Sequence, residues 1–254
     1  MSERLAILRA ITTLFFLALF ATALTACGTR AKKGSAPILL FAGTGTSSGD
    51  VAALETILNA NRLAYSTVSS AELNAMVEDD LGRYRLLILP GGDFVKIGNS
   101  LTPRTTANIR QSVQNGLNYL GICAGAFLAG SFPQPYRSLN LTSGVQFPFY
   151  AAGRSVRKTA VAITIAGGPT LDQYWEDGPQ LTGWGAVVAK YPDGTAAVAQ
   201  GTFGHGWVIL TGVHPEAPES WRRGMTFNTQ ASADNAFAAT LIEAALNRTA
   251  LSHF

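Results

Sequence analysis

Short apolar runs that alternate with helical patterns constrain the fold of this chain more than any other feature. Four runs have the length of a strand: residues 38–42, 64–68, 85–89 and 119–122. Between them, apolar residues recur at helical spacing over 51–61, with Asp50 as the expected N-cap, and Thr102-Pro103 begins a second helix that runs to about Asn115. Such alternation is typical of a parallel sheet covered by helices.

The second half of the chain has a different pattern. Its strand-like runs are rich in small and β-branched residues and resemble antiparallel additions or edge strands: residues 160–165, 186–191, 196–199 and 207–210. A final amphipathic helix is expected over 233–248, with Ser232 as its cap. We therefore predict one α/β domain over 37–250. It is a flavodoxin-like three-layer sandwich with a largely parallel sheet, helices on both faces and extra antiparallel strands in the C-terminal half.

The N-terminus has the features of an export signal. Two cations, Arg4 and Arg9, precede a stretch without charge at residues 10–24, which then ends in Leu-Thr-Ala-Cys27. This ending resembles the lipobox of bacterial lipoproteins. The resemblance implies a signal peptide over 1–26, cleavage before Cys27, a diacylglyceryl group on its sulfur and a fatty acyl chain such as palmitate on its new amine. Residues 27–36 would then be a lipidated tether, and the protein would be exported to the cell envelope and anchored in the lipid bilayer. The alternative is an uncleaved signal anchor with an incidental cysteine.

Charge excludes one class of partner. The formal net charge is +3, from 19 Lys and Arg against 16 Asp and Glu, and no basic block accompanies it. We therefore expect no nucleic acid partner. A protein partner is not indicated either way.

Cysteine usage directs attention to one thiol. The chain has 2 cysteines, so a lipidated Cys27 leaves Cys123 without a partner. Cys123 lies in Gly-Ile-Cys-Ala-Gly (121–125), where a buried strand gives way to a helix. This is the setting of a nucleophile elbow, in which glycines allow a tight turn and the start of the helix favours a thiolate and an oxyanion. The alternative is an inert, buried cysteine.

A thiol nucleophile needs a base, and the chain offers 3 histidines. His253 is in the terminal tail and His205 is in a turn. His214 comes at the carboxyl end of a strand, where a parallel sheet gathers its functional groups. Glu216 follows two residues later and is suited to accept a hydrogen bond from the imidazole.

These residues resemble the Cys-His-Glu triad of class I glutamine amidotransferases. In that family the cysteine attacks the side-chain amide of glutamine, the histidine moves protons and the glutamate orients the histidine. The resemblance extends to Leu-Ile-Leu-Pro-Gly-Gly-Asp (87–93), which matches the family's glycine-rich loop. It implies that the N–H groups of Gly92 and Ala124 form an oxyanion hole.

Within the superfamily, the sequence is most similar to the N-terminal domain of biotin-protein ligases. The likeness lies in three segments: LGICAGA (120–126), YWEDGP (174–179) and GVHPE (212–216). The ligase motif Gly-Arg-Gly-Arg-Gly and a synthetase domain are both missing from the sequence, so ligation and ammonia consumption are not implied. Ala124 stands where the related protease and deglycase branch has histidine, so that branch fits less well.

Other signals are weaker. The segment Gly-Thr-Gly-Thr-Ser-Ser-Gly (43–49) is one residue too long for a dinucleotide fingerprint, and a tight turn explains it better. Scattered histidines and a single free thiol give no ligand cluster, so we expect no metal and no cofactor.

The sequence therefore predicts a membrane-anchored thiol amidase or hydrolase that acts on a γ-glutamyl or other amide bond of a small molecule or peptide. Two alternatives remain. One is a non-catalytic binding or scaffold lipoprotein with an amidotransferase-like fold, and the other is a subunit that delivers ammonia to a separate membrane enzyme.

Overall fold

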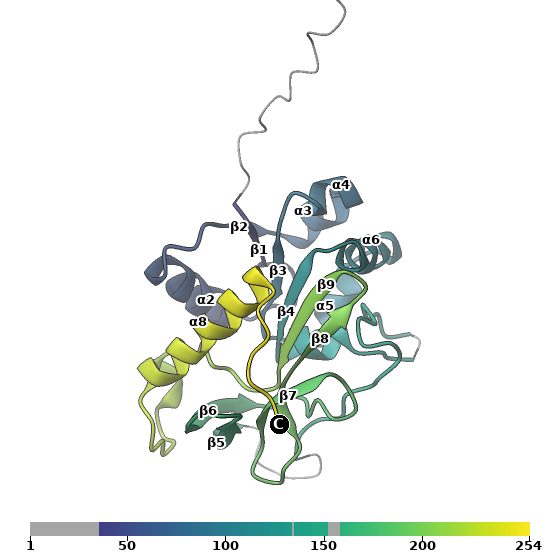
Figure 1. Cartoon of the computed structure of the whole chain (residues 1–254). Helices are drawn as coiled ribbons and strands as arrows, with labels where there is room; N and C mark the ends of the chain where they lie inside the picture. The colour runs from purple at the N-terminus through teal and green to yellow at the C-terminus, as the bar shows by residue number, and fades with distance from the viewer. Residues whose placement is uncertain (1–35, 134, 152–157) are drawn as a thin grey trace, which may run out of the picture. The chain divides into compact units, whose positions relative to one another are not determined.

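The computed structural model describes residues 36–133, 135–151 and 158–254, which belong to one compact unit, Ser35–Phe254. Their strands form a mixed sheet in the order β2-β1-β3-β4-β9-β8-β7-β5-β6 (Figure 1). The parallel part contains β1 (Ile38–Phe41), β2 (Tyr65–Val68), β3 (Leu86–Leu89), β4 (Asn118–Ile122) and β9 (Gly206–Thr211). The antiparallel part contains β5 (Lys158–Ile165), β6 (Thr170–Glu176), β7 (Ala186–Lys190) and β8 (Ala196–Phe203). The predicted α/β fold class is thus confirmed.

Strand β9 joins the two parts of the sheet. It pairs in parallel with β4 and in antiparallel fashion with β8. The interpretation of residues 207–210 as an antiparallel addition or edge strand was therefore wrong, because a run buried between two neighbours has the same apolar composition as a short edge strand. The central place of β9 brings its carboxyl end next to that of β4.

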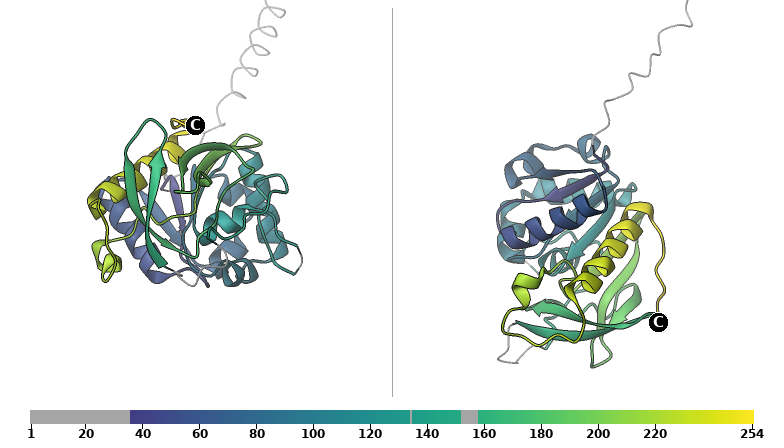
Figure 2. Two further views of the ribbon diagram at one scale, coloured as in Figure 1. Left: turned by 90° about the horizontal axis from the view of Figure 1, so that it is seen from below. Right: turned by 90° about the vertical axis from the view of Figure 1, so that its left-hand side faces the viewer.

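Helices cover both faces of the sheet. On one face lie α2 (Ser48–Ala60) and α8 (Ala231–Asn247), which run side by side in Figure 2. The other face is covered by α3 (Ser70–Ala75), α5 (Phe94–Ser100), α6 (Pro103–Gln114) and α7 (Ala124–Ala129), with α4 (Glu78–Leu81) packed against α6. Side chains alternate along β1 accordingly: Ile38 and Leu40 share a core with α2 and α8, whereas Leu39 and Phe41 share the core of the opposite face.

The helix starts agree only in part with the sequence patterns. Thr102 caps α6 with Pro103 as its first residue, as predicted. Helix α2 begins earlier than expected, with Ser47 rather than Asp50 as N-cap, and its hydroxyl oxygen accepts from the Asp50 N–H at 3.3 Å. Helix α8 begins at Ala231, so Ser232 does not cap it. The side chain of Asp50 therefore does not cap the helix.

The predicted signal peptide, Cys27 and the tether up to residue 35 lie outside the described residues. In the part of the chain that the structure describes, no helix is long and apolar enough to cross a membrane.

Candidate functional site

The Cys123 turn connects β4 to α7. Cys123 has φ 48° and ψ −101°, a region that non-glycine residues rarely adopt. Hydrogen bonds hold it there: its N–H donates to Thr211 O at 2.8 Å, and its carbonyl accepts from Phe127 N at 3.0 Å. A strained residue that is held by hydrogen bonds at a strand-to-helix turn has the geometry of a nucleophile elbow.

Glycines make this turn possible. A Cβ at Gly125 would lie 2.0 Å from Leu89 O, and one at Gly121 would lie 2.6 Å from Gly125 O. Neither position therefore has space for a side chain, because the backbones of β3, β4 and α7 approach too closely. The glycine pattern around Cys123 is thus a packing requirement of the turn.

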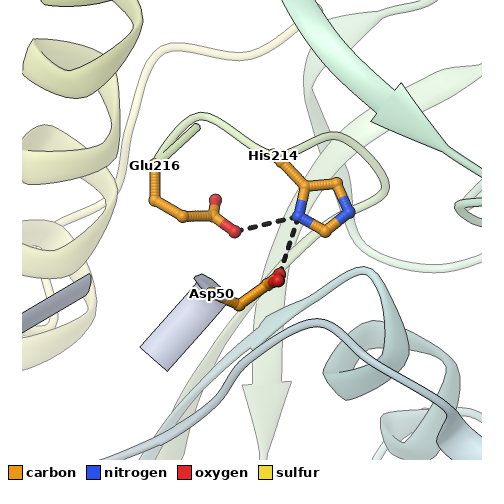
Figure 3. A group of neighbouring side chains, drawn as sticks. All are labelled: Asp50, His214 and Glu216. Atoms are coloured by element: carbon orange, nitrogen blue, oxygen red, sulfur yellow. Dashed lines mark hydrogen bonds and ion pairs between the residues drawn. The ribbon is translucent and has the colours of Figure 1, made fainter. Parts of the chain in front are cut away.

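His214 comes three residues after the end of β9 and is fixed on several sides. Its backbone N–H donates to Tyr174 O at 2.8 Å, and its side chain is buried. The imidazole Nδ1 lies 2.9 Å from Glu216 Oε1 (Figure 3). With a carboxylate as acceptor, Nδ1 carries the proton, which leaves Nε2 as the nitrogen that can serve as a base.

Asp50 is the residue that the sequence analysis missed. Its Oδ1 lies 3.0 Å from His214 Nδ1, so two buried carboxylates flank one imidazole nitrogen (Figure 3). Asp50 projects from the first turn of α2, and a Cβ at Gly91 would lie 2.1 Å from its Oδ1. An acid near a helix start is the ordinary sequence signal of an N-cap. Nothing in the sequence therefore pointed to the contact between Asp50 and His214.

The charges around His214 explain its electrostatics. Burial disfavours the imidazolium, but the charges of Cys123 and Glu216, with side-chain hydrogen bonds to Asp50 and Cys123, raise the pKa of His214 well above its ordinary value. Burial raises the pKa of Glu216, and the nearby Asp50 charge adds to this, although His214 opposes both. The site is built to keep a positive imidazole beside the thiol.

A cleft of about 580 Å³ opens over these residues. Cys123, Asp50 and His214 line it together with Gly92, while Glu216 is buried behind the imidazole. The Cys123 Sγ is 3.6 Å from Glu176 O, at the end of β6. Gly92 has φ 142°, and a Cβ there would lie 2.2 Å from Gly45 O.

The structure therefore brings Cys123, His214 and Glu216 together at the carboxyl ends of β4 and β9, with Gly92 on the cleft wall. Ala124 follows Cys123 directly as the first residue of α7. The ligand atoms of Asp50, His214 and Glu216 lie within 4.8 Å of one another, which is also the donor set of a small cation site. Glu216 Oε1 and Asp50 Oδ1 lie 2.9 and 3.0 Å from His214 Nδ1, so hydrogen bonds to the imidazole explain why the three side chains lie close together.

A family model matches the first half of the described domain. Residues 36–146 match the family model of the biotin-protein ligase N-terminal domain, a stretch that contains Cys123 and ends before His214. A search of curated proteins finds no match.

Solved structures share the fold at low sequence identity. A glutamine amidotransferase is 21% identical and covers 71% of this chain and 90% of its own, with a TM-score of 0.56. PurLQS from Thermotoga maritima is 18% identical over 81% of this chain and 97% of its own, with a TM-score of 0.55. A β-galactosidase from Bacillus circulans sp. alkalophilus, 13% identical, matches 86% of this chain with 32% of its own, at a TM-score of 0.51. The chain has a glutamine amidotransferase-like fold, and that fold also occurs within enzymes of other chemistry.

Proposed function

We propose that this protein is a membrane-anchored thiol amidase or hydrolase that uses Cys123, His214 and Glu216. The observation that carries the proposal is the shared cleft: the thiol on a strained turn and an imidazole whose Nδ1 is fixed by carboxylates line the same cavity. A buried, inert cysteine would not need a histidine held in this way.

The proposed reaction has two steps. The Cys123 thiolate attacks the amide carbonyl carbon and forms a C–S bond, while the N–H groups of Gly92 and Ala124 stabilise the oxyanion. His214 gives its Nε2 proton to the leaving amine as the C–N bond breaks, and Glu216 holds the ring in position. Water then attacks the thioester carbonyl carbon and gives a proton to His214 Nε2, the C–S bond breaks, and the acid leaves with the Cys123 thiolate and the imidazolium restored.

Labelling and turnover test this proposal separately. The wild-type protein and Cys123→Ala are each treated with an electrophilic amide probe, and the adduct is located by mass spectrometry. We expect a single adduct on Cys123 in the wild type and none in the variant. A screen of γ-glutamyl and peptidoglycan-type amides then measures turnover. An adduct without turnover of any amide would favour the binding or scaffold alternative, and an unlabelled Cys123 would contradict the proposal.

The membrane anchor is a separate part of the proposal and rests on residues 1–27. The cationic start, the uncharged stretch and the Leu-Thr-Ala-Cys ending support it. In a bacterial host, the wild type should incorporate radiolabelled palmitate and lose residues 1–26, whereas Cys27→Ala should do neither. Equal labelling of the two forms would refute lipidation at Cys27.

A further inference from the structure

The cleft carries an uneven distribution of charge. Apart from His214, its charged lining residues are all carboxylates: Asp50, Asp93, Glu176 and Asp177. In the described part of the chain, no lysine or arginine lines it. Building on the proposed hydrolysis, we propose that the cleft selects amides that carry a cationic group on an apolar body, and disfavours those with a carboxylate near the scissile bond.

Two of these carboxylates have their charge balanced nearby. Asp50 is paired with His214. Asp93 caps α5 by accepting from the N–H groups of Val95 and Lys96, and the Lys96 ammonium lies 3.3 Å from its other oxygen. These two residues therefore add little to the field that a ligand meets.

Glu176 differs from them because its side-chain contact leaves its charge in place. Its Oε2 accepts from the Tyr174 hydroxyl at 2.6 Å, and a neutral donor stabilises a carboxylate without cancelling its charge. Burial, followed by the hydrogen bond and charge of Glu176, raises the pKa of Tyr174. The Glu176 backbone carbonyl is 3.6 Å from the Cys123 sulfur, and both residues line the cleft, so Glu176 borders the thiol.

The cleft also has an aromatic wall, formed by Phe94, Phe127 and Phe149. Phe94 stacks on Phe127 with ring centroids 4.9 Å apart, and the Phe149 ring centroid lies 4.7 Å from that of Phe127. Phe149 is 44% exposed. Aromatic faces attract cations and accept apolar groups, but they offer nothing to a carboxylate. The carboxylates and the aromatic rings therefore favour the same ligand chemistry.

Charged thiol reagents test this preference without knowledge of the substrate. The cationic 2-aminoethyl and the anionic 2-sulfonatoethyl methanethiosulfonate each form a mixed disulfide with a thiolate and release methanesulfinate. Their second-order rates at Cys123 of the full chain are measured by mass spectrometry and divided by their rates with a small neutral thiol. We expect the normalised rate of the cationic reagent to be about tenfold higher, a factor that corresponds to ~1.4 kcal/mol.

Variants test whether the preference comes from Glu176, at the rim of the cleft. Glu176→Gln keeps an acceptor for the Tyr174 hydroxyl and should lower the ratio about threefold, whereas the exposed Asp79→Asn on α4 serves as the matched control and should leave it unchanged. Equal normalised rates, or a faster anionic reagent, would overturn the charge preference alone. Failure of Cys123 to react with either reagent would overturn the proposed hydrolysis as well.

A second inference rests on the contact between Asp50 and His214. We infer that Asp50 is a positioning residue for His214 and helps Glu216 to hold the imidazole. Asp50 Oδ1 lies 3.0 Å and Glu216 Oε1 lies 2.9 Å from His214 Nδ1, so the single Nδ1–H is placed between two buried carboxylates. Asp50 comes from α2, a separate element from the loop of His214 and Glu216, so it fixes the ring from a second side.

The pKa directions agree with a contact between Asp50 and His214. Burial alone would raise the pKa of Asp50, but the hydrogen bond and charge of His214 outweigh burial and lower it. The pKa of Glu216 is raised, with burial as the main cause. The titratable groups that face His214 come from four segments: Asp50 on α2, Cys123 on its turn, Tyr174 on β6 and Glu216 on the histidine's own loop.

NMR titration of the His214 ring tests the role of Asp50 and does not depend on turnover. Asp50→Asn should lower the pKa of His214, and Asp50→Glu, which keeps the charge, should restore most of the shift. Should Asp50→Asn fail to fold, Asp50→Ser is titrated in its place. A His214 pKa that is the same in the wild type and in the neutral Asp50 variant would overturn the inference.

Discussion

The parallel and antiparallel parts of the sheet contribute different things to the cleft. In the parallel part, every residue of β1, β3 and β4 is buried, and the segments that follow these strands carry Asp50, Gly92 and Cys123. In the antiparallel part, β5 is exposed at Lys158 and Thr164, and β6 is buried between its two ends and leads to Glu176 and Asp177 at the cleft. The groups that we propose to react thus follow strands that are buried throughout, while Glu176 and Asp177 follow a hairpin that is partly exposed.

Mutations in the two parts of the sheet should therefore have different effects on reactivity, ligand preference and stability. Changes in the parallel part should alter Cys123 reactivity or the free energy of unfolding by large amounts, because the backbone there has no space to adjust. Changes at the rim should alter ligand preference and leave stability nearly unchanged.

The largest effect is expected at His214, where the parallel part ends. His214→Gln removes the imidazolium that stabilises the thiolate and should lower the rate of Cys123 alkylation by iodoacetamide at pH 7 by about 100-fold. The rate is measured by mass spectrometry. The exposed His205→Gln, in the turn between β8 and β9, is the control and should react like the wild type. Equal rates in the two variants would remove His214 from the reaction.

The next effect concerns the packing beneath the nucleophile. Gly125→Ala would place a Cβ 2.0 Å from Leu89 O and should lower the free energy of unfolding by about 2–3 kcal/mol, measured by urea denaturation. Gly82→Ala is the control because its Cβ would meet nothing closer than 3.5 Å. A fully stable Gly125→Ala would mean that the parallel part is less rigid than the structure indicates.

A smaller effect is expected in the pH dependence of stability. Burial works against the charged His214, but the Cys123 and Glu216 charges prevail, so its pKa is higher in the folded protein than in the unfolded chain. The folded state therefore binds this proton more tightly, and the stabilisation is fully present below pH ~6.5 and lost as the pH rises through the raised pKa. Each unit of that difference is worth ~1.4 kcal/mol.

Denaturation of the wild type and His214→Gln over a pH series measures this contribution. The advantage of the wild type in the free energy of unfolding should be largest below pH ~6.5 and should decline above it. An advantage that grows with pH would reverse the sign and contradict the charged state assigned to His214.

The parallel part was also the more predictable from the sequence. Its strands are continuous apolar runs between glycine-rich turns, and Cys123 and His214 follow two of them, so the meeting of the two at one edge of the sheet follows from topology. Strand β6 was missed because Asp172 and Gln173 interrupt its apolar pattern, although both are buried. Period and composition carry no information on such buried polar positions.

Asp50 shows a second limit. A carboxylate near a helix start has a sufficient local explanation, and only the packing of α2 beside the β9 loop gives it a partner 164 positions away in the chain (214 − 50). Glu216 was found because it lies next to His214 in sequence. Local pattern therefore predicts Cys123, His214 and Glu216 as candidate site residues, but it cannot predict contacts that depend on the approach of separate elements.

The smallest expected effect separates ligand preference from stability at the rim. Phe149 precedes the antiparallel part and packs on Phe127 while 44% exposed, so Phe149→Ala should lower the free energy of unfolding by less than about 1 kcal/mol. The Cys123 labelling rate of a phenylalkyl iodoacetamide, divided by that of iodoacetamide, should fall about threefold, because the smaller reagent does not reach this wall. Phe254→Ala, at the far end of the chain, is the control and should leave the ratio unchanged. A constant ratio in Phe149→Ala, together with a free energy of unfolding lower by several kcal/mol, would mean that the aromatic wall belongs to the core. Ligand preference and stability would then not be separate properties of different parts of the cleft.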